Sequence, residues 1–336
     1  MKAYRTAVRT LLHHHVETGT SRFFQSYDRR FAPTWSPFEG LDASAVRHWA
    51  ALVWASRNIG DETQTIAQTG LYPSSADIVP VNREAMNAYS GPKVGGLMNG
   101  WFLHKPGSWP PSLAIRAAYI AFHAAPSWDI DDAARAYLKA QEPIGCRDMF
   151  TLRRLADLGI DGYFSGCLTL TLKNPFPETA RTDKVAVVDF ETDWHRKAHP
   201  AATELYERLV PEEIRRAAVS FDQIRSKPGR YVGRSRFDQS VDMLNLLATA
   251  KLVITRRLHT ALPCIAFGTP FVFIHDKFRD DPRFEGFSEY LNGSDRDTQG
   301  VKIDWDRPSP VDGSPLVAHV RESTRRAAAD MIARWS

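Results

Sequence analysis

The sequence predicts an α/β fold made of two Rossmann-like domains with a central cleft between them. Short apolar runs alternate with helical segments along most of the chain, which is typical of parallel sheets covered by helices. The chain has 336 residues, more than one hydrophobic core usually organises. An Asn-Pro-Phe-Pro segment at residues 174–177 interrupts the alternation. We therefore place the domains at residues 1–173 and 174–336, with an irregular extension over residues 1–45.

The first domain is expected to contain several short strands. Apolar runs predict strands at residues 49–54, 78–81, 93–99, 118–122, 143–146 and 163–170. A helix is expected to begin near Glu62 with Asp61 as its N-cap, because a carboxylate accepts hydrogen bonds from the free amides of a first turn. A second helix is expected at residues 148–158.

The second domain opens with a strand at residues 184–189 and continues through a mixed segment. An amphipathic helix is expected at residues 237–250, because its apolar residues recur at helical spacing. A strand–helix–strand unit follows between residues 252 and 274, and a terminal helix covers residues 317–335.

Composition excludes several classes of protein. Apolar residues make up 43% and charged residues 24%, which is ordinary for a globular protein. The net charge is only +4 and no long basic run occurs, so we expect no nucleic-acid partner. No apolar run is long enough to span a membrane. The widely spaced Cys146, Cys167 and Cys264 favour buried thiols and a cytoplasmic location over disulfides or a zinc site.

The N-terminal segment has two interpretations. The apolar pair Leu11-Leu12 is surrounded by Lys2, Arg5, Arg9 and His13-His14-His15, which suggests peripheral contact with the anionic inner face of a membrane. The alternative, which we favour, is a solvated first helix.

The most informative segment runs from Arg256 to Pro270, between the apolar runs 252–254 and 271–274. The pattern predicts a βαβ unit in which Arg256, Arg257 and His259 stand where a strand ends and a helix begins. Open α/β sheets bind ligands at this edge, and helix N-termini attract anions. The segment therefore predicts a phosphate or carboxylate site.

Four more motifs accompany this segment in a fixed order. They are Asn58-Ile59-Gly60-Asp61-Glu62-Thr63-Gln64, Asn99-Gly100-Trp101-Phe102, Ile144-Gly145-Cys146-Arg147-Asp148 and the run from Phe164 to Thr171. With these motifs the chain resembles the polysaccharide pyruvyl transferase family over residues 49–290. The resemblance implies a GT-B-like fold and transfer of pyruvate from phosphoenolpyruvate to two sugar hydroxyls as a cyclic ketal. It also implies a polysaccharide precursor as acceptor, such as a lipid-linked oligosaccharide, with phosphoenolpyruvate as co-substrate and no cofactor. One departure is Arg256, where the family usually has a small or hydroxylated residue.

Phosphoenolpyruvate carries a phosphate and a carboxylate, so its site needs cationic clamps. Arginine binds both groups bidentately through its planar fork. We expect Arg257 and Arg147 to be the main donor-binding residues, with Arg256 and Arg283 as further candidates.

The reaction also needs a group that protonates the methylene carbon of the donor. His259 suits this role, since a bound anion raises the pKa of a histidine, although nearby arginines oppose that shift. Asp61 is expected to orient the acceptor or to act as a base.

The acceptor is expected to contact Asn58, Asn99 and Trp101. Each of these assignments has a structural alternative. Asp61 serves as an N-cap, Asn58 forms a turn, Arg147 pairs only with Asp148, and Trp101 packs in a core.

Two other functions remain open from the sequence. One is a GT-B-type glycosyltransferase that uses a nucleotide sugar, with the basic segment holding the diphosphate. The other is a non-catalytic member that binds glycan or assembles with biosynthetic enzymes. No Walker loop, GxGxxG or GxSxG motif occurs, and we expect no metal requirement.

Overall fold

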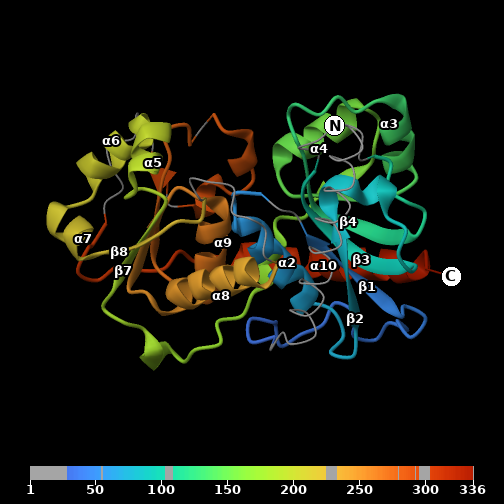
Figure 1. The fold of residues 1–336 in the computed structure, drawn as a ribbon, viewed down its shortest axis with the longest axis horizontal. Helices are drawn as coiled ribbons and strands as arrows, with labels where there is room; N and C mark the ends of the chain where they lie inside the picture. Colours follow the sequence, from blue (N-terminus) through green and yellow to red (C-terminus); the bar gives the residue numbers. More distant parts are fainter. Residues whose placement is uncertain are drawn as a thin grey trace, which may run out of the picture.

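The computed structural model describes residues 29–53, 56–102, 109–224, 233–278, 280–291, 293–294 and 303–335. The expected basic surface at Lys2, Arg5 and Arg9 and most of the extension over residues 1–45 lie outside these residues. In the described part of the chain, two parallel sheets with surrounding helices form the fold (Figure 1).

The first sheet has six strands in the order β2-β1-β3-β4-β5-β6, counted over the described residues. All of its neighbouring strands pair in parallel. The strands are β1 (His48–Val53), β2 (Asp77–Asn82), β3 (Val94–Phe102), β4 (Ile115–Ala124), β5 (Ile144–Cys146) and β6 (Gly162–Phe164). Its helices are α2 (Gly60–Gly70), α3 (Asp132–Lys139) and α4 (Met149–Asp157).

The second sheet has the order β11-β10-β9-β7-β8, also with parallel pairs. Its strands are β7 (Val185–Val188), β8 (Val219–Phe221), β9 (Leu252–Thr255), β10 (Phe271–Ile274) and β11 (Gly293–Ser294). The helices that follow β7 in the chain are α5 (Asp193–Ala198), α6 (Pro200–Leu209), α7 (Glu212–Ala217), α8 (Gly233–Thr249), α9 (Leu258–Phe267) and α10 (Ser314–Ala333).

Both sheets are wound in the same way. If the strands of each sheet are numbered from its first strand, the order 2-1-3-4-5 appears twice. In such a sheet the second strand is added on one side of the first strand and the later strands on the other side. Ligands bind in the crevice beyond the carboxyl ends of the first and third strands, where this switch occurs. The pairs β1/β3 and β7/β9 therefore mark the expected binding edges.

One hydrophobic cluster extends across both halves of the molecule. It contains Trp49 and Leu97 from the first sheet and Val188 and Val253 from the second. Helix α2 packs against α8 and α9, and these helices lie in the middle of the molecule (Figure 1). Helix α10 packs against β3 and β4, although it follows the second sheet in the chain. The division into two domains at residue 173 stays a prediction.

The parallel α/β class and nearly all expected elements are confirmed, and the three cysteines are buried thiols. Two expectations are wrong. The strand predicted at residues 163–170 ends at Phe164, and a 3₁₀ turn follows at Leu168–Thr171, because the chain leaves the sheet at Gly166 with positive φ. Asp61 is not an N-cap: Ile59 holds that position, and Asp61 lies inside the first turn of α2.

Among the described residues, none of the helices has both the length and the apolar character that crossing a bilayer requires.

Candidate anion and sugar site

A cavity of about 460 Å³ lies between the carboxyl edges of the two sheets. From the first half it is lined by residues that follow β1, by Trp101 on β3 and by Arg147 after β5. From the second half it is lined by residues that follow β8 and β9. The two binding edges expected from the strand order thus face one pocket.

Arg257 reaches the pocket from the N-cap position of α9. Its Nε donates to Asp189 Oδ2 at 2.5 Å. In the described part of the chain, Nη2 of this arginine is buried without a hydrogen-bond partner. Asp189 follows β7 and lies in a left-handed conformation with φ of 67°. Although burial opposes ionisation, Arg257 and His195 hold the pKa of Asp189 below its usual value.

Arg256 also lines the pocket and is only 4% exposed. Its Nη2 donates to Asp276 at 3.3 Å, whereas no described residue accepts a hydrogen bond from Nε or Nη1. Burial and the positive charge of Arg257 lower the pKa of Arg256 to about 10. Two adjacent cations, each with a buried donor nitrogen that no described residue accepts from, are suited to a multiply charged anion.

Arg147 follows β5 and enters the pocket from the first sheet. Its Nε donates to Asp148 Oδ2 at 3.3 Å. Asp148 caps α4 by accepting from Thr151 N at 2.9 Å and lies 2.5 Å from His123 Nδ1. The expected pairing of Arg147 with Asp148 is therefore present, and it leaves Arg147 in the pocket wall.

Arg283 lines the same pocket from the 3₁₀ turn Pro282–Phe284. Its Nε donates to both carboxylate oxygens of Asp281, and its guanidinium lies 5.8 Å from the ring centroid of Trp101. Because this arginine is forked onto its own aspartate, fewer of its donors remain for a ligand than at Arg256.

His259 lies in the first turn of α9, inside the pocket. Burial, followed by the charge of Arg147, lowers the pKa of this histidine to about 3. The imidazole is therefore neutral when no anion is bound, mainly because it is buried and further because the arginines repel a positive charge. Its Nε2 finds no hydrogen-bond partner among the residues that the structure describes.

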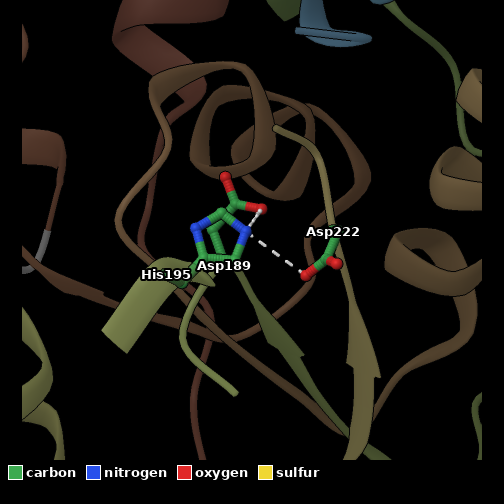
Figure 2. A group of neighbouring side chains, drawn as sticks. All are labelled: Asp189, His195 and Asp222. Atoms are coloured by element: carbon green, nitrogen blue, oxygen red, sulfur yellow. Dashed lines mark ion pairs between the residues drawn. The ribbon is translucent and has the colours of Figure 1, made fainter. Parts of the chain in front are cut away.

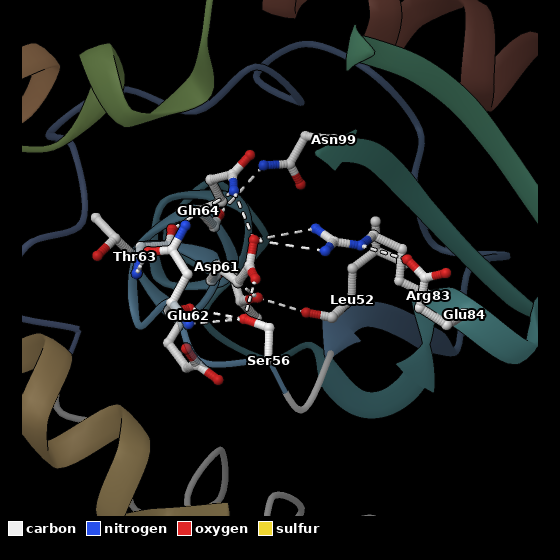
Figure 3. A network of polar contacts seen from close by, with 12 residues as sticks. Leu52, Ser56, Asp61, Glu62, Thr63, Gln64, Arg83, Glu84 and Asn99 are labelled. Atoms are coloured by element: carbon white, nitrogen blue, oxygen red, sulfur yellow. Dashed lines mark hydrogen bonds and ion pairs between the residues drawn. The ribbon is translucent and has the colours of Figure 1, made fainter. Parts of the chain in front are cut away.

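Asp61 lies at the centre of a polar network on the opposite wall (Figure 3). Its Oδ2 accepts from Ser56 Oγ at 2.7 Å, and its Oδ1 accepts from Gln64 Nε2 at 3.4 Å. Both terminal nitrogens of Arg83 lie 3.4 Å from Oδ1. These contacts hold one carboxylate at the beginning of α2, aimed into the pocket.

The three expected acceptor residues lie in different places. Asn58 and Trp101 line the pocket, whereas Asn99 is buried beside a separate cavity of about 10 Å³ and donates to Gln64 O at 3.3 Å. Asn58 Oδ1 accepts from Gly60 N and from Gln223 Nε2, so this side chain also joins the two halves. The ring of Trp101 lies 4.5 Å from that of His123, centroid to centroid.

Two glycines of the sequence motifs make room for this site. A Cβ on Gly60 would lie 2.6 Å from Gln223 Nε2 and 3.1 Å from His259 Cβ. A Cβ on Gly100, whose φ is 134°, would lie 2.9 Å from Arg83 Nη1. Close approach of Gln223 and His259 therefore explains Gly60, and close approach of Arg83 explains Gly100.

Sequence reasoning missed Arg83, Asp189 and His195. Arg83 and Asp189 each stand directly after a strand, at Asn82 and Val188 respectively, which is the signal that identified Arg257. His195 lies in α5 and carries no such signal.

Asp189, His195 and Asp222 bring three candidate metal ligands within 4.8 Å of one another (Figure 2). His195 Nε2 lies 3.1 Å from Asp189 Oδ1 and 3.3 Å from Asp222 Oδ1. Asp189, however, already accepts from Gln223 N at 2.7 Å and from Arg257 Nε. A carboxylate engaged by an amide and a guanidinium is a poor ligand, so we interpret this group as an ion-pair network behind Arg257.

Comparison with known proteins gives one family match. The model of the family described as polysaccharide pyruvyl transferase matches residues 102–275, just over half of the chain. The match includes Arg147, Arg257 and His259. A solved structure of a functionally uncharacterised protein from Klebsiella pneumoniae is 14% identical, with 78% of this chain and 97% of that chain covered and a TM-score of 0.46. No curated protein matches the chain.

Proposed function

Since the chain belongs to the polysaccharide pyruvyl transferase family, we propose that it transfers pyruvate from phosphoenolpyruvate to two hydroxyls of a sugar as a cyclic ketal. The observation that carries this proposal is the group of buried cationic donors in one pocket. Arg256 and Arg257 have three nitrogens whose protons no described residue accepts, and Arg147 lines the same pocket from the first sheet. Phosphoenolpyruvate offers two oxyanion groups that match such donors.

The donor is assigned to the second-sheet edge together with Arg147, which faces it from the first sheet. Arg256, Arg257 and Arg147 bind its phosphate and carboxylate, and the free amides at the beginning of α9 add to the attraction for an anion. Bound negative charge offsets the repulsion from the arginines and raises the pKa of His259 above about 3. His259 then carries the proton that the donor needs.

The reaction balances without a cofactor. His259 gives a proton to the methylene carbon of the donor, and the resulting cationic carbon is attacked by the first sugar hydroxyl. Phosphate leaves, and the second hydroxyl attacks the same carbon to close the ketal. Of the two hydroxyl protons, one leaves with phosphate as hydrogen phosphate and the other restores His259. Asp61, held by Ser56 and Arg83, receives the first hydroxyl proton and passes it on.

The acceptor is assigned to the first-sheet edge, between Asp61 and Trp101. It is a sugar of a cell-surface or exopolysaccharide precursor, and a lipid-linked oligosaccharide is the acceptor class we propose. A cytoplasmic location, with peripheral contact at the inner face of the membrane, belongs to the same proposal.

Ligand-dependent thermal unfolding of the wild type and Arg257→Ala tests the donor. Phosphoenolpyruvate at a hundred times its Kd is expected to stabilise the wild type by about 2.7 kcal/mol and raise Tm by a few degrees, but not to stabilise the variant. A shift with UDP- or GDP-sugars alone would overturn the proposal in favour of a glycosyltransferase. Normal turnover in His259→Ala would show that His259 is not the proton donor.

A further inference from the structure

A buried histidine and a buried aspartate stand behind Arg147. Asp148 Oδ2 accepts from Arg147 Nε at 3.3 Å and lies 2.5 Å from His123 Nδ1. The side chains of His123 and Asp148 are completely buried. Burial and the charge of Arg147 lower the pKa of His123 to about 4, so the ring is neutral and its Nδ1 proton is donated to the carboxylate. We call Arg147, Asp148 and His123 the first trio.

The same combination stands behind Arg257 in the other half. Asp189 Oδ2 accepts from Arg257 Nε, and Asp189 Oδ1 lies 3.1 Å from His195 Nε2 (Figure 2). Asp189 and His195 are each about 1% exposed. We call Arg257, Asp189 and His195 the second trio.

Each aspartate is also fixed to its own backbone surroundings. Asp148 accepts from Thr151 N at the beginning of α4. Asp189 accepts from Gln223 N at 2.7 Å and from Ile224 N at 3.1 Å, next to the end of β8. The carboxylates therefore have little freedom to rotate, and each one limits the orientation of the arginine that donates to it.

Stability alone is a weak reason for these trios. A buried ion pair costs several kcal/mol of desolvation per ion and is often no more stabilising than apolar residues of similar volume. Both trios nevertheless lie directly behind the pocket, with one arginine of each in its wall. Preorganised donors bind and stabilise charge better than donors that must first be ordered.

We propose that the aspartate and histidine of each trio are positioning residues that hold the trio's arginine in the orientation in which it binds the donor anion. The inference rests on the proposed function, since the anion is taken to be phosphoenolpyruvate. It goes beyond that function by assigning a role to side chains that do not touch the ligand.

The sign of the effect of Asp189→Asn separates positioning from simple charge compensation. Removing a negative charge beside an anion site should tighten anion binding if Asp189 only compensates charge. Loss of orientation should weaken it. We expect calorimetric titration of the full chain to show phosphoenolpyruvate binding about tenfold more weakly in Asp189→Asn, within the range of coupled residues. Unchanged or tighter binding would overturn the proposal.

A double-mutant cycle with Arg257→Lys separates positioning from general support of the fold. Lysine carries a compact charge and lacks the planar guanidinium, so its binding to the anion does not depend on the orientation of such a group. Asp189→Asn is therefore expected to weaken binding little further in the Arg257→Lys background. An equal loss in both backgrounds would show that Asp189 only supports the fold. Asp148→Asn with Arg147→Lys gives the same cycle for the first trio.

Two further variants protect this test. His195→Gln leaves the charge of Asp189 in place and replaces Asp189→Asn if that variant does not fold. It is expected to weaken phosphoenolpyruvate binding when Arg257 is present but not in the Arg257→Lys background. His48→Gln is the matched control, because His48 Nδ1 lies 2.7 Å from Asp77 at the amino ends of β1 and β2, away from the pocket. Its binding should equal that of the wild type.

Inorganic phosphate is the second probe and separates this inference from the proposed function. A wild type that binds phosphate but not phosphoenolpyruvate sinks the proposed function, and the same cycles with phosphate then decide the positioning role. A wild type that binds neither anion overturns both.

Discussion

The carboxyl edges of the two sheets share a strand order, but the helices α2 and α9 that begin there carry opposite charges at their first turns. Helix α2 begins at the first edge with Asp61 and Glu62 in its first turn. Helix α9 begins at the second edge after Arg256 and Arg257, with no acidic residue in its first turn. A helix N-terminus attracts anions, but the first turn of α2 already carries two acidic side chains, which disfavour a second anion there. The same strand order can therefore place either an anion-binding helix start or a helix start with carboxylates at the edge of a sheet. The residues around the helix start decide which one is formed.

The largest expected effect comes from His259, because it is the proposed proton donor of the second edge. His259→Gln keeps a hydrogen-bonding side chain but cannot deliver the proton, so kcat should fall by about 10³-fold with a smaller change in KM for phosphoenolpyruvate. The measurement is phosphate release from phosphoenolpyruvate with methyl hexopyranosides as acceptors. Unchanged kcat would show that His259 at the second edge is not the proton donor.

Arg257→Ala and Arg147→Ala test whether both edges hold the donor. Each variant should lower kcat/KM for phosphoenolpyruvate by about 10²-fold or more, because a donor to developing negative charge is lost. Steady-state kinetics under the same conditions give these values. If only Arg257→Ala is impaired, the donor is held by the second edge alone.

Asp61→Asn sharpens the comparison from the other side. The carboxylate is expected to act on the acceptor, so kcat should fall by about 10²-fold while the Kd of phosphoenolpyruvate stays close to that of the wild type. Calorimetry gives the Kd, and phosphate release gives kcat. A large increase in the Kd would instead assign Asp61 to the donor side.

The pH dependence of donor binding follows from the depressed pKa of His259. The empty pocket holds this pKa at about 3, and a bound anion raises it, so binding takes up a proton. Affinity should therefore fall as pH rises through the pKa of the complex, by at most about tenfold per pH unit. Calorimetry at several pH values checks this. The titration of the ligand itself is common to the wild type and His259→Gln, so only the difference between the two proteins counts.

The smallest expected effect concerns the contact between the two edges. Gly60→Ala would press a Cβ against Gln223 and His259, which should lower the free energy of unfolding by about 1 kcal/mol or more and reduce kcat. Gly268→Ala is the control, since the φ of Gly268 is 63° and no atom of the described residues lies within 4 Å of the new Cβ. It should cost about 1 kcal/mol of backbone strain and leave kcat unchanged. Equal losses of kcat would argue against a tight contact at Gly60.

Much of the fold was predictable from local pattern. The strand–helix–strand unit around β9, α9 and β10 agrees with expectation because its apolar runs are short, continuous and bounded by turn residues. The error at residues 163–170 has the same origin: the apolar run continues past Phe164, but these later residues are buried in a 3₁₀ turn rather than in the sheet. Apolar runs report burial, and burial alone does not distinguish a strand from a turn.

The site was predictable where a residue directly follows a strand and not where a partner comes from elsewhere. Arg147, Arg257 and His259 were identified from their motifs, and all three line the pocket. Asp61 was expected to be the N-cap of α2, but Ile59 occupies that position. The contact of His195 with Asp189 had no local signal, since it depends on where α5 packs.

The sequence by itself determined the α/β class, the positions of most strands, and the cationic residues at the beginning of α9, because apolar runs and the residues that follow them are local properties of the chain. Only the tertiary structure decided that the two edges face one pocket, that Arg83 holds Asp61, and that a buried histidine and aspartate stand behind each clamp arginine. It also decided that His259 is neutral in the empty pocket. A pKa depends on burial and on the summed charge of side chains distant in sequence, and these are set only when the two sheets pack together.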